Sequence, residues 1–167
     1  MWARRRAVNW AHVHIMINHT PIIGAVFGVV FLAYAMWRKS AELERVGLGI
    51  LVIIAITAIV TFLTGEPAEE FLTSVVPDIP EPVRDRHCGL AAVAMGASIA
   101  AGACALVGLA VSWRSRVPSR RLVWASLFLA GIALVLMAWT GHRGAQIRHT
   151  EVRPGVEAAA PPTGRGQ

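Results

Sequence analysis

The sequence is poor in charged residues and in cysteine. Only 16% of its 167 residues are charged, and Cys88 and Cys104 are its only cysteines. So little charge is not the composition of a disordered chain, and two cysteines are too few for a disulfide framework. Apolar residues dominate instead, at 55% of the chain, with a mean hydropathy of +0.54. The composition therefore predicts an integral membrane protein.

Four apolar stretches contain no aspartate, glutamate, lysine or arginine: residues 13–37, 46–64, 88–113 and 122–140. A helix of roughly 20 residues crosses a bilayer core of about 30 Å. We therefore predict an all-α, integral membrane four-helix bundle in a transmembrane domain at 1–150, followed by a flexible tail at 151–167. The uncharged spans also argue against ion pumping and transport of charged substrates, which need ionisable residues at membrane depth.

The one long connection is expected at residues 65–87. Gly65 is typical of a helix C-cap, and Pro67 of the first position of a new helix. We expect a short interfacial helix at about 67–76, lying on the membrane surface. Its apolar face would be formed by Phe71, Leu72, Val75 and Val76. Glu69 and Glu70 would point toward water on the other side. The prolines that are expected to end it are Pro77, Pro80 and Pro82.

The net charge of +6 is concentrated in the two short loops, 38–45 and 114–121. These loops hold seven basic and two acidic residues, close to the span ends where the positive-inside bias operates. We therefore expect the short loops in the cytoplasm and both termini on the periplasmic side of a bacterial inner membrane, although Arg4–Arg6 favour the opposite orientation. Because the basic charge is explained by topology, no nucleic-acid partner is predicted.

Small side chains recur at every fourth position of the third predicted span. The residues are Cys88, Ala92, Gly96, Ala100, Cys104, Gly108 and Ser112. Small residues let helices approach closely in lipid, so we expect this row to pack inside the bundle or, as a second interpretation, to dock another subunit. Sixteen helical residues separate the cysteines by roughly 24 Å, which excludes a disulfide within the chain. Cys104 is expected to be a buried free thiol.

All six histidines are expected on the face that carries the termini: His12, His14, His19, His87, His142 and His149. His19, His87 and His142, together with Glu66, bring one polar group from each span to a similar depth. Such imidazoles are typical axial ligands of haem b, and His19 and His87 are the leading pair. They could also bind a metal with carboxylate partners or hydrogen-bond a quinone. The structural alternative is that they are amphipathic residues tolerated at headgroup depth.

Motifs for hydrolysis, phosphoryl transfer or haem c attachment are absent, as is a Cys-x-x-Cys pair. The sequence favours a non-catalytic role for this reason. Two functions remain. The first is an accessory transmembrane subunit of a bacterial respiratory or photosynthetic complex, with the lipid bilayer and other membrane subunits as partners. The alternative is a redox or quinone-interacting membrane protein that binds haem b or a metal at the outer face.

Two motifs carry a family resemblance: H-I-M-I-N-H-T-P-I-I-G at His14–Gly24, followed by W-R-K-S-A-E-L-E-R, and T-G-E-P-A-E-E at Thr64–Glu70. With a histidine opening the third span, the chain resembles a family of uncharacterised four-helix bacterial inner-membrane proteins over about residues 12–112. The matching positions are Asn18, His19, Pro21, Gly65, Glu66, Pro67 and His87. The resemblance implies the fold and the location but no activity. A family-like glutamate after that histidine is replaced by Cys88, which argues against a metal site of histidine and carboxylate.

Overall fold

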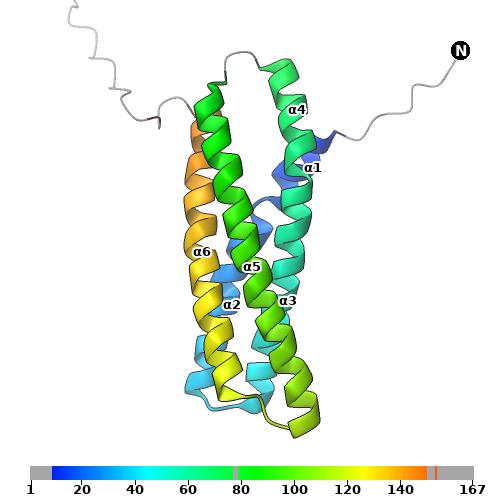
Figure 1. Cartoon of the computed structure of the whole chain (residues 1–167), viewed down its shortest axis with the longest axis vertical. Coiled ribbons are helices and arrows are strands. Elements are labelled where there is room, and N and C mark those ends of the chain that lie inside the picture. The colour runs from blue at the N-terminus through cyan, green and yellow to red at the C-terminus, as the bar shows by residue number, and fades with distance from the viewer. Residues whose placement is uncertain (1–8, 77–78, 150–152, 154–167) are drawn as a thin grey trace, which may run out of the picture.

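The computed structural model of the chain describes residues 9–76, 79–149 and 153, and all regular structure in them is helical. Four long helices run side by side in alternating directions (Figure 1): α2 (Thr20–Trp37), α3 (Ala41–Leu63), α5 (Glu81–Ser115) and α6 (Arg120–Arg148). Four segments of the fold are long and apolar enough to cross a membrane: Trp10–Trp37, Ala41–Val75, Glu81–Ser115 and Arg120–Ile147. The predicted all-α four-helix membrane bundle is confirmed.

Each long helix packs against two neighbours. α3 lies between α2 and α5, and α6 lies between α5 and α2, so the four close into a ring. The loops between α2 and α3 and between α5 and α6 are tight, and each contains one residue with a positive φ, 52° at Lys39 and 65° at Arg116. Such short connections require antiparallel neighbours, as the sequence predicts.

The interior of the bundle contains many small residues, and many bulky side chains point outward. The buried face of α5 consists of Ala94, Ser98, Ala101, Gly102, Ala105, Gly108 and Ser112. By contrast Phe27, Val135 and Phe128 leave 66–69% of their surface exposed. This is the pattern of helices that pack closely against one another while lipid covers their outer faces.

Glycine is required where α3 and α5 come closest. A Cβ atom on Gly102 would lie 2.4 Å from Cβ of Ala55, closer than two carbon atoms can pack. A Cβ on Gly47 would lie 2.8 Å from Cδ1 of Leu32, at the contact between α3 and α2. The missing side chains at Gly102 and Gly47 allow α3 to approach α5 and α2 closely, and so set how these three helices pack.

The first predicted span is two helices rather than one. α1 (Trp10–Ile17) begins at Asn9, whose Oδ1 accepts a hydrogen bond from the His12 amide at 3.1 Å, and α2 begins after a break at residues 18–19. Pro21 lies in the first turn of α2, where its missing N–H costs nothing. The break lets α1 leave the line of α2 and pack against α4 (Gly65–Val75).

The segment predicted as a long loop is largely helical. The short helix expected at 67–76 is present as α4, but Figure 1 shows that it continues along the bundle axis from α3 rather than lying across the end. α5 already begins at Glu81, because Pro82 occupies its first turn and therefore starts a helix instead of ending one. Pro77 lies outside the described residues. In place of the expected surface helix and loop, α4 and the first turns of α5 lengthen the bundle (Figure 1).

The row of small residues in α5 does not form one continuous face. Each four-residue step rotates by about 40° on a helix of 3.6 residues per turn, so the row winds around the axis. Gly108 and Ser112 are buried and Cys104 is half-buried, whereas Ala92, Gly96 and Ala100 are exposed. Internal packing therefore accounts only for the half of the row nearest the short loops.

Candidate functional site

Two half-buried histidines lie at the end of the bundle that carries α1 and α4. His14 lies on α1, and its Nδ1 is 3.1 Å from Oγ1 of Thr64, the residue that joins α3 to α4. His87 lies near the start of α5, with Nδ1 3.1 Å from the carbonyl oxygen of Thr140 on α6. Both rings thus lie at the same end of the bundle, each held by an oxygen of a neighbouring segment, and they are called the histidine pair below. The motifs at His14–Gly24 and Thr64–Glu70 thus meet in space.

Hydrogen bonding fixes which nitrogen carries the proton when each ring is neutral. The Thr140 carbonyl can only accept, so Nδ1 of His87 must donate. The Thr64 hydroxyl donates its own proton to the Thr61 carbonyl at 2.9 Å, so it accepts from Nδ1 of His14. In each neutral imidazole Nε2 then keeps its lone pair. This is the arrangement found in histidines that bind metals, whose other ring nitrogen donates to an oxygen of the protein.

Glycines make room for the two rings. A Cβ on Gly144 of α6 would lie 3.0 Å from Cε1 and 3.2 Å from Nδ1 of His87, and a Cβ on Gly65 would lie 3.6 Å from Cε1 of His14. Next to His14 the Oδ1 atom of Asn18 is buried without a hydrogen-bond partner among the described residues. The two half-buried imidazoles are therefore held by hydroxyl and carbonyl oxygens in a polar region of the bundle.

The other predicted ligands do not join this pair. His19 forms the N-cap position of α2, but its side chain is exposed and caps no amide. His142 is exposed on α6, with Nε2 3.4 Å from Nε2 of Gln146 one turn away. Glu66 is exposed in the first turn of α4 and makes no ion pair with the residues that the structure describes. The break that precedes Pro21 lets α1 pack on α4, and this places His14, rather than His19, against Thr64.

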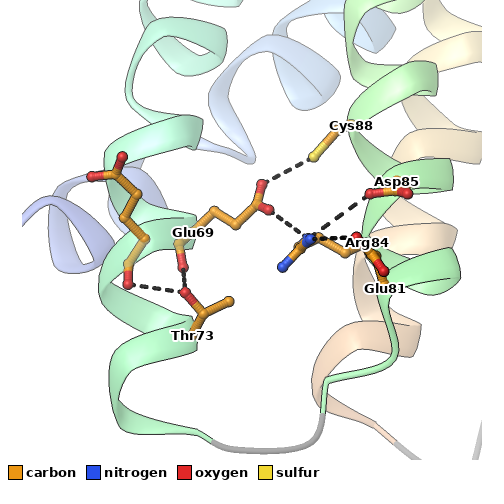
Figure 2. A network of polar contacts seen from close by, with 7 residues as sticks. Glu69, Thr73, Glu81, Arg84, Asp85 and Cys88 are labelled. Atoms are coloured by element: carbon orange, nitrogen blue, oxygen red, sulfur yellow. Dashed lines mark hydrogen bonds and ion pairs between the residues drawn. The ribbon is translucent and has the colours of Figure 1, made fainter.

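A network of polar contacts joins α4 to α5 at the same end (Figure 2). Glu69 accepts from Nε of Arg84 at 2.8 Å and from Sγ of Cys88 at 3.1 Å. Arg84 also lies 3.7 Å from Glu81 and 3.9 Å from Asp85. The prediction that Glu69 points to water is wrong, since this ion pair turns it toward α5. Phe71 and Val75 are exposed instead.

Neither cysteine forms a disulfide. Cys88 is exposed and free, and Cys104 is a free thiol whose Sγ lies 3.8 Å from the Leu122 carbonyl oxygen. The prediction of two unpaired thiols is confirmed, although Cys104 is half-buried rather than buried. In residues 9–76, 79–149 and 153, no cluster of three or more histidine, cysteine, aspartate and glutamate side chains is arranged to hold a metal ion.

The sequence placed His14 among six histidines but did not select it. Asn9 is a strong N-cap residue, so a helix starting at Trp10 was readable from the sequence, and it would have put His14 in the second turn. The roles of Thr64, Thr140 and Gly144 carry no local signal. They depend on which helices are neighbours, and that emerges only from the assembled bundle.

Comparison with known proteins does not extend this description. The chain matches no family model, no curated protein and no solved structure at a significant level. The site is therefore interpreted from its own geometry, and the resemblance carried by residues 14–24 and 64–70 stays a prediction.

Proposed function

We propose that the chain is a non-catalytic accessory transmembrane subunit of a bacterial respiratory or photosynthetic complex. The observation that carries this proposal is the exposed half of the small-residue row on α5, formed by Ala92, Gly96 and Ala100. A Cβ on Gly96 would meet no atom of the chain within 4 Å. Exposed small residues on a membrane helix let a second helix approach closely, and dispersion contacts then hold the two together.

The same proposal includes the membrane in which the protein lies and its orientation there. We place the protein in a bacterial inner membrane, with the basic short loops in the cytoplasm and both termini on the periplasmic side. The exposed row then lies in the periplasmic half of α5. The exposed apolar side chains of Phe71 and Val75 on α4 would add to a contact surface at this end.

Purification from native membranes in a mild detergent tests this proposal. We expect further membrane subunits to co-purify with the tagged chain and to be identified by mass spectrometry. Gly96→Leu fills the exposed row without a clash inside the chain, so it should release them. Gly49→Leu on α3 is the control, since its Cβ also meets nothing within 4 Å. A monodisperse chain without companions would count against the proposal.

A second function is supported by the histidine pair. With Nδ1 donating in both His14 and His87, each neutral ring presents an Nε2 lone pair, the donor chemistry that ligates haem b or a metal ion; a protonated Nε2 would instead donate to a quinone carbonyl. Bound haem would supply one-electron chemistry. The chain itself would hold and orient the group, with Thr64 and Thr140 fixing the rings.

A reduced-minus-oxidised absorption spectrum of the purified protein distinguishes the two functions. If haem is bound, an α band appears, and both His14→Ala and His87→Ala abolish it. His19→Ala and His142→Ala are matched controls, since these two side chains are exposed and lie outside the pair. The absence of a band, together with no bound metal by elemental analysis, would exclude haem and metal binding by this pair.

A further inference from the structure

We propose that a groove between α2 and α6, at the short-loop end of the bundle, binds an anionic phospholipid. Its phosphate would lie on Arg120, and one acyl chain would follow α6 across Gly131. This site lies at the opposite end from the histidine pair and does not depend on either function proposed above.

The headgroup end is an open groove of about 250 Å³. It is lined by Ala33, Met36, Trp37, Arg120, Trp124 and Leu127. Trp37 and Trp124 are 76% and 57% exposed, as is typical of tryptophans at the headgroup level of a membrane. A basic pocket between membrane helices, flanked by aromatic residues, is suited to a lipid phosphate.

Arg120 supplies the charge in this groove. Its Nη1 donates to Glu44, while its side chain stays 55% exposed and its Nε and Nη2 groups make no other hydrogen bond within the described ranges. A guanidinium with free donors binds phosphate through paired hydrogen bonds. Ser119, the N-cap of α6, makes no side-chain cap, so this end of the helix keeps the partial positive charge of its dipole next to Arg120.

The apolar part of the site continues along α6. A hollow of about 430 Å³ is lined by Leu127, Phe128, Gly131, Ile132, Val135 and Leu136, and it shares Leu127 with the headgroup groove. A Cβ on Gly131 would meet no atom of the chain within 4 Å, so the hollow is open above this glycine. From Leu127 to Val135 the helix rises about 12 Å, close to the roughly 15 Å of hydrocarbon in one leaflet.

Charge and symmetry favour a lipid over a second copy of the chain. Two copies inserted in the same direction would pair these faces around a two-fold axis, which brings the two Arg120 side chains to the same depth and near each other. The nearby exposed residues Arg38 and Lys39 would add to the repulsion. An anionic headgroup complements the same cluster, and its acyl chain matches the apolar hollow.

Native mass spectrometry of the full chain in a neutral detergent tests the proposal. The probes are phosphatidylglycerol and phosphatidylcholine with identical acyl chains. We expect phosphatidylglycerol to bind about tenfold more tightly. Arg120→Gln should remove this preference, whereas Arg121→Gln should keep it because Arg121 does not line the groove. Equal binding of the two lipids, or equal losses in both variants, would overturn the proposal.

A second pair of variants avoids the ion pair between Arg120 and Glu44. Gly131→Leu fills the hollow without a clash and should weaken phosphatidylglycerol binding about tenfold. Gly141→Leu is the control on the same helix, since its Cβ also meets nothing within 4 Å and it lies beyond the hollow. Unchanged lipid binding in Gly131→Leu would refute the site. A dimer of the unmodified chain that Gly131→Leu dissociates would assign this face to a second copy instead.

Discussion

Glu44 and Arg120 form an ion pair that joins α3 to α6 at the short-loop end. Oε1 of Glu44 lies 2.9 Å from Nη1 of Arg120, and Glu44 is only 4% exposed. The next residue, Arg45, donates to Oγ of Ser112 at 2.6 Å and to the carbonyl oxygen of Arg116. Two consecutive residues of α3 thus hold both sides of the turn between α5 and α6.

Removing the carboxylate of this pair should destabilise the bundle. Glu44→Ala is expected to lower the free energy of unfolding by about 1.5–3 kcal/mol, because a hydrogen bond between charged groups is lost at a buried position. Glu42→Ala in the same turn is the control, since Glu42 is exposed and makes no ion pair with the described residues. Unfolding in mixed micelles, followed by circular dichroism, measures both. Equal losses would show that the pair contributes nothing specific.

Gly102 and Gly96 should respond oppositely to the same added methyl group. Gly102→Ala places a Cβ 2.4 Å from that of Ala55, so α3 and α5 must move apart, at a cost of about 1–3 kcal/mol. Gly96→Ala meets nothing within 4 Å and should stabilise the helix by up to about 1 kcal/mol. The same unfolding assay on the purified chain compares them. Similar stabilities for the two variants would contradict the close contact.

The fold was predictable because it depends on how apolar and charged residues are distributed over long stretches of the chain. Four stretches without charge, joined by short basic loops, suffice to specify four antiparallel membrane helices. Pro82 was predicted to end a helix, but it lies in the first turn of α5. A proline in the first turn of a helix helps to start it, whereas a proline further along interrupts it. The small-residue row of α5 packs internally over only part of its length, because positions spaced by exactly four residues drift around the helix axis.

The candidate site was only partly predictable. The sequence indicated the end of the bundle and selected His87, which the structure pairs with another histidine. The sequence favoured His19 over His14, because the direction of α1 relative to α2 is set by the packing of α1 on α4, which local spacing does not reveal. The oxygens that orient the rings, on Thr64 and Thr140, come from other helices and leave no trace in local spacing.

Gly144 should tolerate a methyl group less well than Gly141, although both lie within α6. Alanine gains about 1 kcal/mol over glycine inside a helix, and Gly141→Ala should realise this gain because its Cβ meets nothing within 4 Å. In Gly144→Ala the Cβ would lie 3.0 Å from Cε1 of His87, so the imidazole must shift by a few tenths of an ångström, which strains its hydrogen bond to the Thr140 carbonyl. We expect the second variant to be the less stable in thermal unfolding. Equal melting temperatures would show that His87 is not held against α6.

Ser126 should be replaceable by alanine with a gain in stability. Its Oγ is fully buried and has no hydrogen-bond partner among the described residues. A buried polar atom without a partner costs about 1–3 kcal/mol, so Ser126→Ala is expected to raise the free energy of unfolding by about 1 kcal/mol. Ser98→Ala is the matched control, since that hydroxyl is equally buried but donates to the Ala94 carbonyl at 2.7 Å, and its loss should bring no gain. Both are measured by micelle unfolding, and a loss of stability in Ser126→Ala would mean that its hydroxyl has a partner in the folded protein.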